Sequence, residues 1–272
     1  MPVGAVQRAV DALVAGAGRR LAASAPGSER WLLAARDRYA RAYVALTRVR
    51  NRLRYDAPPE PYRLLRVDPA EVRGMAGRDR PMYRAAGVVE GGDWDRVDER
   101  FADTDVYRAY EAHFEDGVPW DETAFYDRIV EEIASGRTRW GCDSKAAFDA
   151  RCERLDDLYE TIATEGFRSQ AALAADGGGP LGEPTALPTE RRKDEVAVHV
   201  GRDGDLLFAD GRNRLAIAKL LDLEAIPVRV LRRHADWQAE RDSVARGESV
   251  DAGPTHPDLP TAARDPAAAG GV

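Results

Sequence analysis

Residues 205–234, DLLFADGRNRLAIAKLLDLEAIPVRVLRRH, constrain the fold more than any other part of the chain. Residues 206–208 are a short apolar run that ends at Asp210-Gly211, which is a turn sequence. The segment 213–223 is apolar on almost every side, as is typical of a buried helix. After Pro227, valine and leucine alternate with arginine as in a half-buried strand. The pattern predicts a strand, a tight turn, a helix and a second strand.

The turn carries two arginines where the predicted helix begins. Arg212 and Arg214 lie at the positive end of the helix dipole, where cations are unfavourable. The first N–H groups of a helix are also unpaired, and Gly211 would let a ligand approach the main chain. These features together indicate a bound anion, most simply a phosphate. The alternative is a structural salt bridge from Asp210 or Asp222, and the residue chemistry alone favours neither.

Three segments resemble the ParB/sulfiredoxin superfamily. Residues 210–218, DGRNRLAIA, followed by 223–228, LEAIPV, resemble its phosphate-binding box, which has a G-x-x-R-x-x-A core. Residues 155–167, LDDLYETIATEGF, are similar to the helix and glycine that precede this box in ParB N-terminal domains. Residues 62–69, YRLLRVDP, are similar to the first strand of that domain. The three segments occur in the same order as in the family.

The resemblance implies an α/β (α+β) fold with a small mixed sheet and helices. We expect this domain to span residues 58–240, with a helical insertion at about 75–150 and the segment 62–67 paired near 228–231. Residues 1–57 are expected to be a helical N-terminal segment. Residues 241–272 are rich in Pro, Gly, Ala and acidic residues, which predicts a disordered tail.

The resemblance also implies a function and its alternatives. The expected function is binding of a nucleotide or another phosphate-bearing ligand at the DGRNR turn, with Mg²⁺ as a further expectation. The alternatives are a phosphoryl-transfer or nuclease-like enzyme using the same pocket, or a non-catalytic, DNA-associated interaction protein. Sulfiredoxin chemistry is excluded because the box has no cysteine. The free-serine kinases of the superfamily have D-G-H-H-R, and here Arg212 and Asn213 replace both histidines. We expect no DNA-reading domain after the box.

Each residue of the turn has an expected role. Arg214 would make the main bidentate contact with the phosphate, Arg212 would add a second charge, and Asn213 an amide that donates and accepts. Asp210 would orient an arginine or hold Mg²⁺. A loop at 174–194 is expected to fold over the ligand through three basic residues, Arg191, Arg192 and Lys193.

Residues 28–53 are predicted to form a two-faced, arginine-rich helix. One side carries Leu32, Tyr39, Leu46 and Leu53, and the other carries Arg30, Arg41, Arg48 and Arg52. From Ser28 to Arg54 there are eight arginines but only two acidic residues, Glu29 and Asp37. We expect the apolar side to pack on the domain or on a second copy in a homodimer. The arginines would be a solvated face, or would contact nucleic acid or an acidic partner.

Three helices are predicted at residues 104–114, 121–135 and 144–165. His113 lacks a second histidine at helical spacing, so no metal site is predicted there. The sequence GGDWD at 91–95 has two readings. Trp94 is a plug in the core, or Asp93, Trp94 and Asp95 form a second ligand or partner site.

The overall composition limits the function classes. The chain has 272 residues and a net charge of −7, which argues against bulk affinity for nucleic acid or anionic lipid. Two cysteines fit neither a disulfide scaffold nor a zinc site, and Cys152 falls on an apolar stripe. No apolar run is long enough to span a membrane, and the N-terminus lacks a signal-peptide pattern. We therefore expect a cytoplasmic protein.

Overall fold

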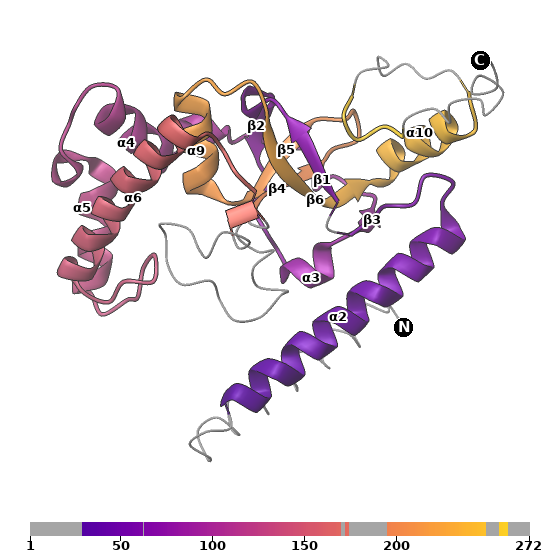
Figure 1. The fold of residues 1–272 in the computed structure, drawn as a ribbon, viewed down its shortest axis with the longest axis horizontal. Helices are drawn as coiled ribbons and strands as arrows, with labels where there is room; N and C mark the ends of the chain where they lie inside the picture. The colour runs from indigo at the N-terminus through magenta and orange to yellow at the C-terminus, as the bar shows by residue number, and fades with distance from the viewer. Residues whose placement is uncertain (1–28, 62, 170–171, 174–194, 249–255, 261–272) are drawn as a thin grey trace.

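A computed structural model describes residues 29–61, 63–169, 172–173, 195–248 and 256–260. The described part is a mixed α/β protein with seven α-helices and one six-stranded sheet. Figure 1 shows the sheet in the centre, a group of helices at one end and α10 at the other. The long helix α2 runs beside this body, with α3 between it and the sheet (Figure 1).

The sheet has the order β1-β6-β4-β5-β2, and β3 also pairs with β6. Its strands are β1 (Leu64–Val67), β2 (Val72–Met75), β3 (Val88–Glu90), β4 (Val196–Val200), β5 (Leu206–Asp210) and β6 (Ile226–His234). β1 and β6 are antiparallel, with Leu65 opposite Val228, which confirms the predicted pairing of the first strand. β4 is antiparallel to β5 and parallel to β6, so the sheet is mixed as expected.

Both faces of the sheet are covered. Val196 and Val198 belong to the main core, which they share with the helix α9 (Arg212–Leu220). Ala197, which points to the opposite face, packs in a smaller cluster with α3 (Met82–Ala85). β6 is therefore buried along all nine residues, its arginines included. The expectation of a half-buried strand was wrong, because a strand inside a two-sided sheet has no exposed face.

The three helices predicted between the first strand and the box are present. They are α4 (Asp105–Phe114), α5 (Ala124–Ala134) and α6 (Lys145–Glu165). Each begins after a hydroxyl residue whose side chain accepts a main-chain hydrogen bond, namely Thr104, Thr123 and Ser144. The insertion at 75–150 is not purely helical, however, because β3 lies within it and joins the sheet. The helices pack against α9 and enlarge the core on that face.

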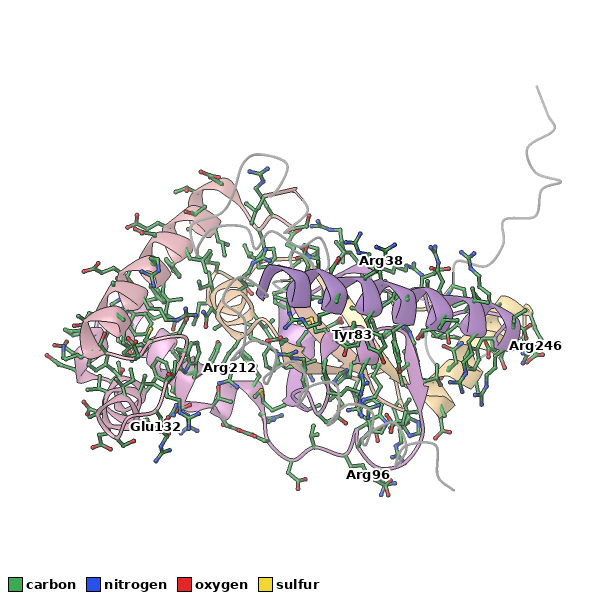
Figure 2. All side chains as sticks on the ribbon, turned by 90° about the horizontal axis from the view of Figure 1, so that it is seen from below. Arg38, Tyr83, Arg96, Glu132, Arg212 and Arg246 are labelled. Carbon is green, nitrogen blue, oxygen red and sulfur yellow. The ribbon has the colours of Figure 1, made fainter. Side chains whose placement is uncertain are left out.

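The helix α2 (Glu29–Arg54) is present, but most of its apolar face does not pack on the domain, while packing on a second copy stays a prediction. Tyr39, Leu46 and Leu53 are exposed, while the side chains of Arg30 and Leu32 lie outside the described part. The helix instead buries a stripe of small and polar residues, Asp37, Ala40, Val44 and Asn51. Small side chains allow close approach to α3, and Figure 2 shows Tyr83 between α2 and the domain.

Backbone acceptors explain the polar part of this buried stripe. The Asn51 amide donates to the carbonyls of Pro59 and Gly87, at 2.9 and 2.8 Å. Both acceptors lie in loops that an apolar face would leave without hydrogen-bond partners. Hydrogen-bond demand in the domain therefore decides which side of α2 is buried.

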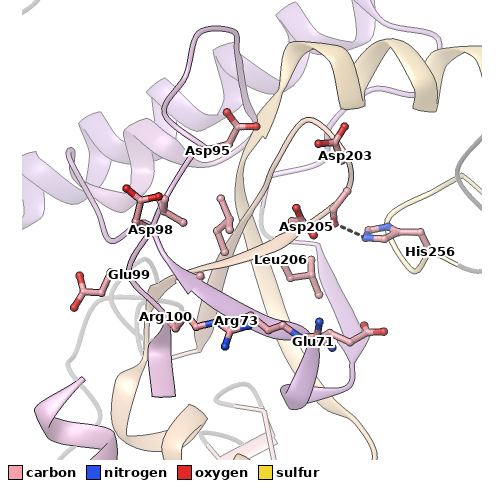
Figure 3. Close-up of a pocket in the computed structure, with 14 residues that line it drawn as sticks. Glu71, Arg73, Asp95, Asp98, Glu99, Arg100, Asp203, Asp205, Leu206 and His256 are labelled. Atoms are coloured by element: carbon pink, nitrogen blue, oxygen red, sulfur yellow. Dashed lines mark hydrogen bonds between the residues drawn. The ribbon is translucent and has the colours of Figure 1, made fainter. Parts of the chain in front are cut away.

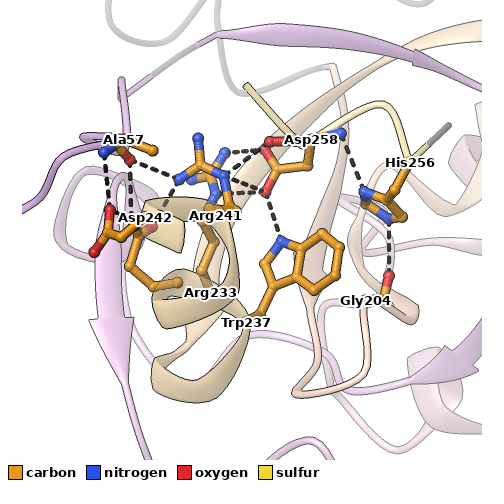
Figure 4. A network of polar contacts seen from close by, with 9 residues as sticks. Ala57, Gly204, Arg233, Trp237, Arg241, Asp242, His256 and Asp258 are labelled. Carbon is orange, nitrogen blue, oxygen red and sulfur yellow. Dashed lines mark hydrogen bonds and ion pairs between the residues drawn. The ribbon is translucent and has the colours of Figure 1, made fainter. Parts of the chain in front are cut away.

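The end of the chain contradicts the predicted disordered tail in two places. The helix α10 (Ala235–Ala245) continues past residue 240, and residues 256–260 lie against it. Asp258 is fully buried and accepts hydrogen bonds from Arg233, at 2.8 and 2.6 Å, and from the Trp237 indole at 2.9 Å (Figure 4). Arg241 donates to the Asp258 carbonyl at 2.8 Å. One buried carboxylate thus anchors this segment, although its composition resembles that of a disordered chain.

The Asp258 network predicts a pH-dependent contribution to stability. Burial would raise the pKa of Asp258, but the charges of Arg233 and Arg241 outweigh it and lower the pKa to about 2. The folded state therefore favours the carboxylate, which stabilises the protein above pH ~4 and loses its effect as the pH falls to ~2. We expect Asp258→Asn to reduce the free energy of unfolding by about 3 kcal/mol at pH 7, because it leaves buried arginines without a counter-charge.

Urea unfolding at several pH values measures this effect. Asp98→Asn serves as the control, because Asp98 is exposed. A loss of the same size in both variants, or an Asp258→Asn effect that persists at pH 2, would show that this carboxylate does not hold the segment in place.

Candidate phosphate-binding site

The site begins at the turn between β5 and α9. Gly211 has φ +88°, a left-handed conformation that favours glycine. A Cβ at this position would lie 2.8 Å from the Val196 Cα and 3.2 Å from the Glu195 carbonyl oxygen. The sequence predicted that a ligand would approach Gly211 closely, but the backbone of β4 occupies that position. Glycine is required because the first turn of α9 presses on the neighbouring strand.

Asp210 ends β5 and is engaged on both carboxylate oxygens. One oxygen accepts from the Gly211 N–H at 2.9 Å, and the other pairs with the Arg78 guanidinium at 2.9 Å. Of its two expected roles, this geometry favours the orientation of an arginine. It does not fit Mg²⁺, which prefers several oxygen ligands with free lone pairs. Among the described residues, no cluster of three or more His, Cys, Asp or Glu could hold a metal ion.

Arg214 is buried behind the turn. Its guanidinium pairs with Glu195 at 3.4 Å, donates to the Arg168 carbonyl and stacks on the Phe167 ring at 4.2 Å. Neither Asp210 nor Asp222, the two partners considered from the sequence, makes this contact. The salt-bridge interpretation therefore describes Arg214, with Glu195 as the carboxylate. The predicted bidentate contact with a ligand would require this side chain to leave these partners.

Arg212 is placed differently. Its side chain is half-buried, and its guanidinium lies 5.9 Å from the centre of the Trp140 ring. Arg151, from α6, lies 5.4 Å from the same ring. Within the described part of the chain, neither Arg212 nor Arg151 forms an ion pair with a carboxylate. The first turn of α9 therefore keeps positive charge that Glu195 and Asp210 do not neutralise.

Several hydrogen-bonding groups near this charge also lack partners among the described residues. They include the buried Tyr110 hydroxyl, the Arg151 Nε and the Asn213 side-chain oxygen. Burial raises the pKa of Tyr110 above its ordinary value, and the nearby charge of Arg151 only partly opposes this. The phenol therefore remains protonated and is a hydrogen-bond donor.

The main chain adds donors at the same place. α9 has no side-chain cap at its N-terminus. Within the described chain, the first internal hydrogen bond of the helix is donated by Leu215 to the Gly211 carbonyl at 3.1 Å. The preceding N–H groups, of Arg212 and Asn213, are the free donors expected at a helix start. The residues expected to close over them, Arg191, Arg192 and Lys193, lie outside the described residues.

Trp140 has an unusual backbone. Its φ is +54°, a conformation that bulky residues rarely adopt. A tight turn holds it there, with hydrogen bonds between Arg139 and Cys142 in both directions at 2.9 and 2.7 Å. Such strain persists only where the surroundings impose it, and it concentrates at functional sites.

The GGDWD cluster is a structural joint. Asp95 is buried and accepts from the main chain and side chain of Arg202, at 2.8 and 2.9 Å, which ties this loop to the β4–β5 hairpin. Trp94 stacks on Arg232 at 3.9 Å and touches His199 edge-on. Asp93 is mostly exposed. Trp94 is half-buried and belongs to neither core cluster, so neither of its two expected roles is established.

A cavity of about 490 Å³ opens at the other end of β2 and β5 (Figure 3). Six carboxylates line it, and Arg73 and Arg100 are its two basic residues. The acidic residues are Glu71, Asp95, Asp98, Glu99, Asp203 and Asp205. This excess of negative charge repels anions, so the cavity does not compete with the α9 turn for a phosphate.

Sequence reasoning missed Arg78, Arg151, Tyr110 and Trp140. They come from the β2–α3 loop, α6, α4 and the α5–α6 turn, all distant from the box in sequence. Tyr110 lies in the helix predicted at residues 104–114. Its hydroxyl was a weak signal, because a buried tyrosine normally needs a partner for that group.

Comparisons with protein-family models, curated proteins and solved structures gave no match. The ParB/sulfiredoxin resemblance therefore rests on the residues quoted above. No helix in the described part of the chain combines the length and apolar character that crossing a membrane requires.

The Gly211 contact predicts a large cost for a single methyl group. Gly211→Ala should lower the free energy of unfolding by about 3 kcal/mol, since it adds left-handed strain to a clash with β4. Gly117→Ala is the matched control, because Gly117 has φ +72° but open space around a Cβ. It should cost only about 1 kcal/mol. Equal losses in thermal or urea unfolding would contradict the role given to β4.

His199, which is buried beside the Trp94 ring, predicts a pH-dependent contribution to stability. Burial, followed by the charge of Arg232, lowers the pKa of His199 to about 4. Its Nε2 donates to the Gly77 carbonyl at 3.0 Å in the neutral form. Stability from neutral His199 is present above pH ~6.5 and is lost as the pH falls towards 4, by up to about 3 kcal/mol. His199→Gln should flatten this part of the pH–stability curve, and an unchanged curve would contradict the assignment.

Proposed function

We propose that the chain binds a phosphate-bearing ligand, in the first instance a nucleotide, at the first turn of α9. The observation that carries the proposal is the uncompensated charge of Arg212 and Arg151 beside the free N–H groups of that turn. A helix start with unpaired amides and nearby guanidiniums attracts an anion. The ParB-like box sequence 210–218 supports the same ligand class.

In this proposal the main-chain amides of Arg212 and Asn213 hold one phosphate group. The Arg212 guanidinium supplies the principal charge, and Arg151 approaches from α6. The protonated Tyr110 hydroxyl is a third kind of donor, and its lack of a partner among the described residues supports this role. Trp140, held in a strained turn, has the guanidiniums of Arg151 and Arg212 at 5.4 and 5.9 Å from its ring centre and so contributes to positioning them.

Arg214 then has a positioning role. Its pair with Glu195 ties the first turn of α9 to the start of β4, and its stacking on Phe167 ties it to the segment after α6. Arg214→Ala would leave Glu195 buried without its counter-charge and would cost stability, about 3–5 kcal/mol. A change in ligand affinity in that variant would therefore mix unfolding with lost binding. Arg212 is the better residue for a test.

Isothermal titration with inorganic pyrophosphate and with ATP, each with and without Mg²⁺, tests the proposal. Arg212→Ala should weaken binding roughly ten- to a hundredfold, because it removes a charge-assisted hydrogen bond of about 1.5–3 kcal/mol. Its thermal stability should be unchanged or slightly higher, since a cation leaves the positive end of the helix dipole.

The matched control is Arg96→Ala, which removes an arginine whose side chain is 70% exposed and far along the chain from the turn. It should bind as the unaltered protein does. Full-strength binding in Arg212→Ala, or equal weakening in both variants, would contradict a site at this turn. Analysis of the titrated ATP for hydrolysis products distinguishes a binding protein from an enzyme using the same pocket.

A further inference from the structure

The exposed apolar side chains of the described residues are concentrated on one helix. Of the five large apolar side chains that are exposed in the described part of the chain, four belong to α2. These are Tyr39 at 44%, Leu46 at 71%, Val49 at 56% and Leu53 at 85%. Single exposed apolar residues are ordinary, but a continuous exposed stripe marks an interaction surface.

The stripe has the spacing of a coiled coil. Tyr39, Leu46 and Leu53 recur every seven residues, and Ala42 and Val49 lie between them at the alternating three- and four-residue steps. We call these five residues the α2 seam. The buried stripe that attaches α2 to the domain, which includes Ala40 and Val44, is on the opposite side of the helix. Leu46, Val49 and Leu53 therefore point away from the domain, whereas the Tyr39 ring meets the Tyr83 ring of α3 edge-on, with their centres 6.0 Å apart.

Among the described residues of α2, the charged side chains beside the seam are all arginines. Arg36 and Arg50 occupy one flank, and Arg38 and Arg52 the other, at the positions that set partner choice in coiled coils. The single carboxylate between residues 34 and 54 is Asp37, which is buried. Arg52 pairs with Glu60 at 3.0 Å, whereas Arg38 and Arg50 form no ion pair within the described part. Figure 2 shows Arg38 directed away from the domain.

We propose that the α2 seam docks an amphipathic helix of another protein, with apolar residues at heptad spacing and Glu or Asp on both flanks. The apolar stripe supplies the contact area, and the arginine flanks select an acidic partner. Burial of a Leu or Val side chain contributes about 1.5–3 kcal/mol, so the seam can support a stable helix pair. This partner does not depend on the ligand at α9.

The seam disfavours a second copy of this chain. In a parallel pair, each flank of one helix faces the opposite flank of its copy. In an antiparallel pair, each flank faces the same flank of its copy. Arginine therefore opposes arginine in both cases. Like charges at these positions destabilise the pair.

The seam also fits a helix better than a lipid surface or nucleic acid. A helix lying on a membrane needs a broad apolar face, whereas the α2 seam is limited to the narrow pair of coiled-coil positions. Nucleic acid would be attracted to the arginines, but it would cover Leu46 and Leu53 without an apolar counterpart.

The experiment uses the full chain and two labelled synthetic helices of four heptads, followed by fluorescence anisotropy. Both carry leucine at the seam positions. One has glutamate on its flanks and the other has lysine. The glutamate peptide should bind at least tenfold more tightly than the lysine peptide, and the difference should shrink as salt is added.

Two variants locate the binding. Leu46→Glu with Leu53→Glu should abolish it without a change in melting temperature, since both side chains are exposed. Ala146→Glu with Ala163→Glu adds the same charge to exposed positions of α6 and should bind normally. Arg38→Glu with Arg50→Glu should reverse the preference, so that the lysine peptide binds more tightly.

Three results would overturn the proposal. The first is equal binding of both peptides, or no reversal by the flank variant. The second is recruitment of the chain to vesicles of phosphatidylglycerol or to duplex DNA, lost in the Leu46/Leu53 variant, without peptide binding. The third is self-association in sedimentation that the Leu46/Leu53 variant abolishes.

Discussion

The contact between Gly211 and the backbone of β4 determines how the rest of the candidate site is arranged. The first turn of α9 can lie this close to β4 only because Gly211, the turn residue after β5, has no Cβ. That approach brings Glu195 within reach of Arg214 and holds the first turn of α9 at the edge of the sheet. The amides and guanidiniums of the turn are thereby fixed before any ligand arrives, and such preorganisation reduces the cost of binding.

The arginines of this acidic protein lie in three kinds of environment. In the core it is paired or stacked, as Arg233 is with Asp258 and Arg232 is with Trp94. Along α2 it lies outside, where water screens its charge. At the α9 turn Arg212 is only half-buried and has no carboxylate among the described residues. The position of Arg212 is the least favourable of the three without a counter-ion. It is the reason for proposing a ligand at that turn.

The sequence predicted the helices and strands better than the contacts that their side chains make. Helix caps such as Thr104, and the strand, turn and helix around Asp210, could be read locally because their signals lie within a few residues. The pairing of β1 with β6 was anticipated from the ParB-like order of segments and not from spacing. Side-chain partners could not be read, because Glu195 and Arg214 meet only through the sheet register.

The incorrect predictions have the same physical origin, because the groups that decide each contact are distant in the sequence. The buried side of α2 is chosen by carbonyls of Pro59 and Gly87 that the helix sequence does not contain. The tail composition suggested disorder because nothing local shows that Asp258 enters a pocket of two arginines. Charge patterns indicated a candidate site at the α9 turn, but they could not show which of its arginines is paired with a carboxylate.

A crystal structure of the protein with pyrophosphate bound tests the central claim most directly. We predict a phosphate group within hydrogen-bonding distance of the main-chain N–H groups of Arg212 and Asn213, with the Arg212 guanidinium turned towards it and the Arg214–Glu195 pair intact. Pyrophosphate bound elsewhere, for example along the arginines of α2, would contradict the account. So would an empty turn at a concentration that saturates the protein in solution.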